Sequence, residues 1–100
     1  MPVFHPGHDS FHGFTMLLQS NGPRTFVGRW DAVEGDVVWL NDAAVHTDGE
    51  YGVSKSAFLE QLAMLGPTNT VARIAIPLSE VHSVERLGDW KRNRRTYSSD

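Results

Sequence analysis

Three of the five histidines lie close together near the start of the chain, at His5, His8 and His12. A neutral imidazole is a good ligand for zinc, nickel or copper, and Asp9 adds a carboxylate to the same stretch. A specific metal site also needs a fixed backbone and hydrogen bonds that orient each ring. A proline and a glycine interrupt this stretch, so nothing local fixes it. We therefore favour an irregular His-rich lead-in over residues 1–13, with a metal site on these histidines as the alternative.

Four of the nine Lys and Arg residues lie in the last ten positions, at Lys91, Arg92, Arg94 and Arg95. Such a cluster can bind phosphate in a salt-dependent way that does not depend on sequence. Residues 1–90 carry five basic residues against eleven acidic ones, so the body of the chain does not attract nucleic acid broadly. We predict a basic, unstructured tail over residues 89–100. Its alternative roles are contact with nucleic acid and contact with the acidic body of another copy.

Other candidate nucleic-acid or ligand-binding residues lie in or beside predicted strands, at Arg24, Arg29, Trp30, Asn41 and His82. An exposed tryptophan can stack on a base, and Trp30 with Tyr51 and two arginines could line a pocket between copies. A large aromatic side chain in a small domain more often packs in the core or at a subunit interface. Core packing is therefore the favoured interpretation for Trp30.

Support for catalysis is thin. The chain has no cysteine, which excludes disulfides, Cys-based zinc fingers and thiol catalysis. It also lacks a G-x-S-x-G elbow, a glycine-rich phosphate loop and an H-E-x-x-H pair. Ser79, Glu80 and His82 are close in sequence, but nothing places them in the geometry of a triad. We expect no enzyme activity and no cofactor.

The totals fit a single small domain, which we place at residues 14–88. The chain has 100 residues, of which 40% are hydrophobic and 21% are charged, and its formal net charge is −3. No apolar run is long enough for a membrane helix, and no signal-peptide pattern opens the sequence. We therefore expect a cytoplasmic protein with no membrane segment.

Residue types and turn signals predict five short strands and one helix. The strands are expected over residues 14–18, 25–33, 37–45, 70–76 and 81–87, and the helix over residues 54–65. Gly28 falls in the middle of the second strand and indicates a sharp bend or a close backbone approach. A closed barrel removes most strand edges, which suits so short a chain. We predict a mainly-β, five-stranded small barrel of order β-β-β-α-β-β, with the helix as a lid over one open end.

The stretches "FVGRW", "GDVVWLNDA" and "ARIAIPLSEVHSVERL" resemble the two-part signature of Sm-like and SH3-like small barrels, over about residues 14–87. For Sm-like proteins this resemblance implies ring-shaped homo-oligomers that bind RNA along one face. The residues of the RNA pocket match poorly. Asn41 follows the first motif, but the closing turn has no Arg-Gly or Lys-His pair, and His82 is the one candidate there.

A second resemblance covers "FVGRW", "VVWLNDA" and "EQLAMLG". These stretches are similar to a group of small proteins, many from phages or mobile elements, that carry a helix between the third and fourth strands. This resemblance implies a fold and a genomic origin, and it implies no activity.

We therefore predict a non-enzymatic, self-assembling small-barrel module that acts in interaction or scaffolding. The alternatives are an Sm-like RNA-binding protein and a protein that binds a small ligand or nucleotide between its copies.

Overall fold

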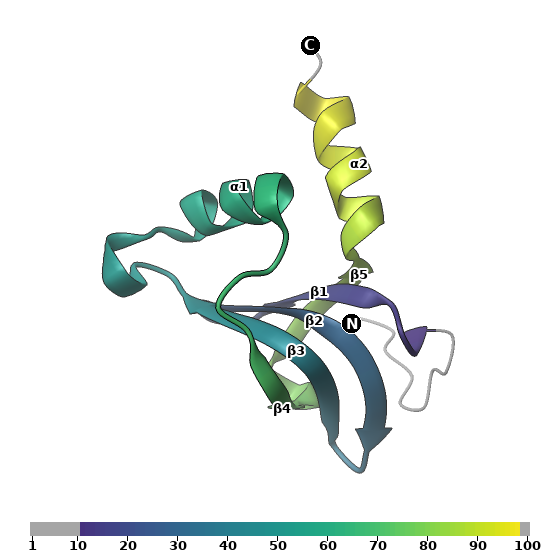
Figure 1. Cartoon of the computed structure of the whole chain (residues 1–100). Coiled ribbons are helices and arrows are strands. Elements are labelled where there is room, and N and C mark those ends of the chain that lie inside the picture. Colours follow the sequence, from purple (N-terminus) through teal and green to yellow (C-terminus); the bar gives the residue numbers. More distant parts are fainter. Residues whose placement is uncertain (1–10, 99–100) are drawn as a thin grey trace.

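The computed structural model describes residues 11–98, with side chains described as far as residue 93 (Figure 1). The strands are β1 (Thr15–Ser20), β2 (Arg24–Glu34), β3 (Val37–Thr47), β4 (Val71–Pro77) and β5 (Val81–Arg86). The helices are α1 (Lys55–Leu65) and α2 (Leu87–Ser98), and the short 3-10 turns are η2 (Glu50–Gly52) and η3 (Leu78–Glu80). The five expected strands are all present.

The strands form one sheet of order β4-β3-β2-β1-β5, in which every pairing is antiparallel. The prediction of a closed barrel is wrong, because β4 and β5 are the two outer strands of this sheet and are not paired with each other. The sheet is nevertheless strongly curled. The three residues of η3 are enough to join the end of β4 to the start of β5.

The bend of the sheet is concentrated at Gly28 of β2. A Cβ atom added to Gly28 would lie 2.8 Å from the Cβ of Ala43 and 3.0 Å from its Cα, so the two backbones approach too closely for a side chain. The register of β2 and β3 shifts at this point, and Asp42 beside it has a positive φ of 49°. The close backbone approach predicted at Gly28 is therefore confirmed.

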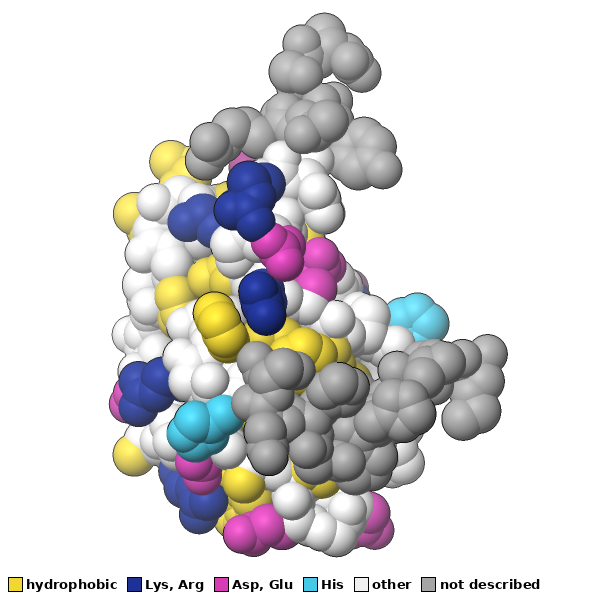
Figure 2. All heavy atoms as spheres, turned by 90° about the vertical axis from the view of Figure 1, so that its right-hand side faces the viewer, with side chains coloured by type: hydrophobic (Ala, Val, Ile, Leu, Met, Phe, Trp, Pro, Cys, Tyr) yellow, Lys and Arg dark blue, Asp and Glu magenta, His cyan; other side chains and the backbone are white. Residues whose placement is uncertain are grey.

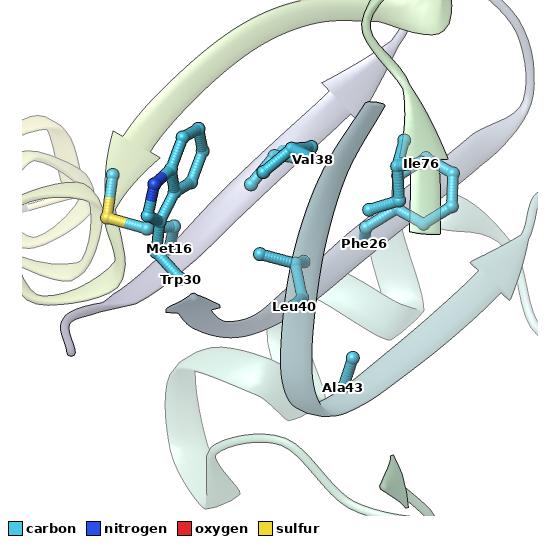
Figure 3. Packing of buried hydrophobic residues seen from close by; sticks show 8 residues of the cluster. Met16, Phe26, Trp30, Val38, Leu40, Ala43 and Ile76 are labelled. Atoms are coloured by element: carbon cyan, nitrogen blue, oxygen red, sulfur yellow. The ribbon is translucent and has the colours of Figure 1, made fainter. Parts of the chain in front are cut away.

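Hydrophobic side chains fill the inside of this bend, and we call this group the inner core (Figure 3). Its buried members are Met16, Leu18, Phe26, Trp30, Val38, Leu40, Ala43 and Ile76. They come from four of the five strands, so their burial depends on the curl of the whole sheet. Removing this apolar surface from water is the main force that favours the fold.

A second cluster, the outer core, packs both helices on the opposite face of the sheet. Leu17, Val27 and Ala44 of the strands meet Leu62 of α1, and Leu87 and Trp90 of α2. The expected position of the helix as a lid over a barrel end therefore differs from the structure. Helix α1 follows β3 and precedes β4 in the chain, but it lies against a face of the sheet (Figure 1).

Helix α2 also corrects the expected tail. Residues 89–98 are helical in the structure, whereas the polar sequence led us to predict an unstructured segment. Leu87 and Trp90 are three positions apart, so they share one face of a helix and both pack in the outer core. This small apolar anchor explains why so polar a segment is helical where it leaves the sheet.

Two residues beside the β1–β2 turn hold η3 in place. The guanidinium of Arg24 donates two hydrogen bonds to the carboxylate of Glu80, and its Nε lies 2.7 Å from Oε2. This side-chain hydrogen bonding raises the pKa of Arg24. The Nδ2 of Asn21 donates to the carbonyl of Ser79 at 3.1 Å, and its backbone N–H donates to the carbonyl of Glu80 at 3.0 Å. The junction of the two outer strands is thereby fixed to β2.

We predict that Gly28→Ala destabilises the protein by about 1–3 kcal/mol, as is typical when an atom is forced into a packed site. Urea unfolding followed by circular dichroism measures the change. Gly22→Ala is the matched control, because no atom lies within 4 Å of a Cβ placed at Gly22. Equal stability of the Gly28→Ala and Gly22→Ala variants would contradict the role assigned to the bend.

Candidate assembly interface

The two outer strands present the unpaired backbone edges of the sheet. Within residues 11–98, β4 pairs only with β3, and β5 pairs only with β1. An open strand edge exposes a row of N–H and C=O groups that can pair with another chain. The edges of β4 and β5 are therefore a candidate site of association.

Exposed hydrophobic side chains lie at the start of β4 and at the end of α1, the helix that precedes β4 in the chain. Val71, the first residue of β4, is 50% exposed, and Met64 and Leu65 in the last turn of α1 are 78% and 71% exposed. None of these three side chains belongs to the inner core or to the outer core. A group of exposed apolar side chains beside an open edge is typical of a protein interface.

A cavity of about 410 Å³ lies where β5 continues into α2, and it is lined by the start of β1, the end of β5 and the start of α2. Phe14 and Leu87 line it together with four charged residues, Arg86, Asp89, Lys91 and Arg92. The guanidinium of Arg86 lies over the ring of Phe14, 4.2 Å from its centroid. Figure 2 views the molecule from this side and shows hydrophobic side chains at the surface, bordered by basic and acidic ones. This edge therefore combines an apolar hollow with a charged border.

The ionised carboxylate of Glu85, which precedes the cavity residue Arg86, is electrostatically unfavourable in the folded protein. Its burial raises the pKa of the carboxyl, and the negative charge of Asp89 raises it further. A carboxyl group whose pKa is raised in the folded state lowers the free energy of unfolding at every pH at which it is ionised. This loss of stability is therefore present at neutral pH. The loss disappears below the ordinary pKa of the group, where Glu85 is protonated in both the folded and unfolded states.

We predict that Glu85→Gln stabilises the protein at pH 7.5 by at most about 0.5 kcal/mol, because the carboxyl is only partly buried. The difference from the wild type should vanish as the pH falls to about 4. Urea midpoints across this pH range measure it, and Asp36→Asn serves as a control at an exposed carboxylate in the β2–β3 turn. A destabilised Glu85→Gln variant at pH 7.5 would show that the carboxylate has a favourable partner.

The structure does not gather the candidate ligand residues into one site. Arg24 is bound to Glu80, and Arg29 forms an ion pair with Asp42 at 2.8 Å. Trp30 is 2% exposed in the inner core, so it offers no stacking surface. Asn41 is the register partner of Arg29, which places these two on neighbouring strands.

The remaining candidates lie on β5 and α2, the last two elements of the chain. His82 is exposed on β5, and Lys91 and Arg92 line the cavity at the start of α2. Arg94 and Arg95 belong to α2, but their side chains lie outside the described part.

The metal hypothesis receives no support from the part of the chain that is described. His5 and His8 lie outside it. His12 is exposed, and its Nδ1 lies 2.8 Å from the carbonyl oxygen of Asp31. Among residues 11–98, no three His, Cys, Asp or Glu side chains are grouped as a metal site would require. The histidine cluster as a whole therefore stays a prediction.

His46 is a buried polar residue that the sequence reasoning missed. Its ring stacks on that of Phe58 from α1 at a centroid distance of 4.5 Å, and the residue is 6% exposed. Neither ring nitrogen has a hydrogen-bond partner, and the same holds for the hydroxyl of Thr25, its register partner on β2. His46 lies two positions after the buried Ala44, and strand alternation could have identified it.

We predict that His46→Phe stabilises the protein by about 1 kcal/mol, because it keeps an aromatic ring against Phe58 and removes two buried polar atoms without partners. His46→Leu tests whether the gain follows from polarity alone. Both variants are measured by urea unfolding at neutral pH. A loss of stability in both would mean that the imidazole makes a favourable interaction in solution.

No helix within residues 11–98 is long and apolar enough to cross a membrane.

Comparison with known proteins gives a likeness of fold. No protein-family model and no curated protein matches the chain. The Sm protein of Pyrococcus abyssii, solved in complex with a uridine heptamer, superposes with a TM-score of 0.52 at 16% identity. That match covers 77% of this chain and 87% of the other. A chain of the NatC complex bound to CoA superposes with a TM-score of 0.53 at 13% identity, over 91% of this chain and 99% of that one.

At these identities the likeness shows the fold alone. The chain therefore has an Sm-like, bent, five-stranded antiparallel sheet, and the resemblance to Sm-like proteins is confirmed at this level. The resemblance to phage and mobile-element proteins stays a prediction.

Proposed function

We propose that the chain is a non-enzymatic, self-assembling interaction module whose copies join through the edges of their sheets. The observation that carries this proposal is that β4 and β5 both have an unpaired edge in the described chain. Pairing these edges between copies gives the backbone groups partners and removes apolar surface from water. Small domains gain stability in this way, because one copy has only a limited core.

The edge of β4 in one copy pairs with the edge of β5 in the next. Exposed Val71 begins β4, and exposed Met64 and Leu65 end the preceding helix α1. A cavity with an apolar part and a charged border lies where β5 meets α2, so the two edges complement each other. Contacts between two different surfaces lead to a closed ring or to an open filament. Of the two structural neighbours, the chain of the NatC complex belongs to a larger assembly, whereas the uridine heptamer bound to the Sm protein supports the RNA-binding alternative.

The nucleic-acid and ligand alternatives have less support from the described side chains. Arg24 and Arg29 are paired with carboxylates, and Trp30 is buried. Phosphate binding needs several available cations on one surface. The clearest such group is at the start of α2, where Asp89 forms an ion pair with Arg92 and reduces the positive charge.

We predict that the purified full chain forms oligomers whose mass, measured by light scattering, falls on dilution. Val71→Lys should raise the dissociation constant at least about tenfold, because it places a charge at the start of the β4 edge. Tyr51→Lys is the control, since Tyr51 is 93% exposed and lies in η2, outside both β4 and β5.

Two results bear on the proposal. A monomer at high micromolar concentration would overturn it. An oligomer with a raised ratio of absorbance at 260 nm to that at 280 nm would indicate bound nucleic acid or nucleotide, and the RNA-binding or ligand-binding alternative would then replace a purely structural role.

A further inference from the structure

We propose that the last turn of α1 docks onto the start of α2 in a second copy of the chain, with Met64 and Leu65 entering the cavity beside Phe14. This inference rests on the proposed assembly through β4 and β5. It goes beyond that assembly by assigning a specific contact to the two helices.

Chain direction brings these helices together. If the antiparallel pattern of the sheet continues across the interface, the first residue of β4, Val71, lies opposite the last residue of β5, Arg86, in the next copy. Helix α1 ends six positions before Val71, and α2 begins immediately after Arg86. Both helices pack on the same face of their own sheet through Leu62 and Trp90. The end of α1 in one copy and the start of α2 in the next therefore lie on the same side of the joined sheet.

The surfaces that meet there match in polarity. The two apolar side chains at the end of α1 are more than two-thirds exposed and have no role in either core of their own copy. The cavity of about 410 Å³ has an apolar part formed by Phe14, Leu87 and Gly88, and its other lining residues are Thr15, Arg86, Asp89, Lys91 and Arg92. Burying a Leu or Met side chain in such a hollow is favourable by the area that it removes from water.

The charges also match. The last turn of α1 contains no basic residue, so the partial negative charge of its terminal carbonyl groups has no cation from its own turn. Three cations, Arg86, Lys91 and Arg92, line the cavity that would receive this helix end, together with one acid, Asp89, which forms an ion pair with Arg92. A cation beside a helix C-terminus is stabilising, and salt screens the effect. The contact should therefore weaken as the ionic strength rises.

Disulfide trapping tests the contact directly, because the chain contains no cysteine. One variant carries Leu65→Cys and a second, of different mass, carries Gly88→Cys. No atom lies within 4 Å of a Cβ placed at Gly88, and its φ is not positive, so a side chain is accommodated there. After the two variants are mixed and oxidised, we expect a mixed disulfide as the main cross-linked product, identified by mass spectrometry.

Gly22→Cys replaces Gly88→Cys in the control mixture. Gly22 has similar free space, but it follows Ser20, the register partner of Val81 at the start of β5. It therefore lies at the opposite end of β5 from α2, about 20 Å from the proposed contact. This pair should give at least about tenfold less mixed disulfide.

A second variant measures the contribution of the contact to assembly. Met64→Gln with Leu65→Gln should raise the dissociation constant at least about tenfold, and circular dichroism should show an unchanged fold because both side chains are exposed. The control is Tyr51→Gln, which also replaces an exposed apolar side chain but at η2.

The outcomes separate this inference from the proposed function. Oligomers that give no preferred Leu65–Gly88 disulfide, or that keep their affinity in the Met64→Gln, Leu65→Gln variant, would overturn the helix contact while the assembly through strand edges stands. A wild-type chain that is monomeric at every concentration would overturn both. Preferential cross-linking together with weakened assembly of the double variant would establish the contact.

Discussion

The close approach of two backbones at Gly28 is the constraint on which the rest of the structure depends. Because Gly28 has no side chain, Ala43 can lie directly against β2, and β2 and β3 bend together. The bend wraps the strands around the inner core and turns the other face of the sheet outward. A flat sheet of this length would leave much of one face exposed to water, whereas the bent sheet buries side chains on both faces.

The outer core then decides where the helices lie. Leu17, Val27 and Ala44 form one apolar surface on the outside of the bend, and Leu62 and Trp90 cover it from α1 and α2. The start of α1 is set by local interactions, because the hydroxyl of Ser54 accepts a hydrogen bond from the N–H of Ala57 at 3.1 Å. The start of α2 depends on the outer core instead, since its two buried residues, Leu87 and Trp90, pack there with residues of the sheet and of α1.

Features encoded by neighbouring residues could be predicted from the sequence. The five strands, the special role of Gly28 and the helix that ends before Gly66 all follow from local residue patterns. The open sheet could not be predicted, because the pairing of β4 with β5 along their length depends on the curl of the whole sheet and not on local residue patterns. Helix α2 could not be predicted either, because its sequence is mostly polar and lacks an apolar helical pattern. In the same way, Arg24 was recognised as a candidate residue, but its partner Glu80 lies 56 positions away.

The open shape of the sheet gives the proposed assembly its physical basis. The turn η3, held by Arg24, fixes the end of β4 near the start of β5, but no strand pairing joins the two along their length. Closing the barrel within one chain would pair both edges with each other. Within residues 11–98 both edges instead lack strand partners. In the proposed assembly, a second copy forms the hydrogen bonds to these backbone groups that closure of the barrel would have formed. It also buries the exposed apolar side chains.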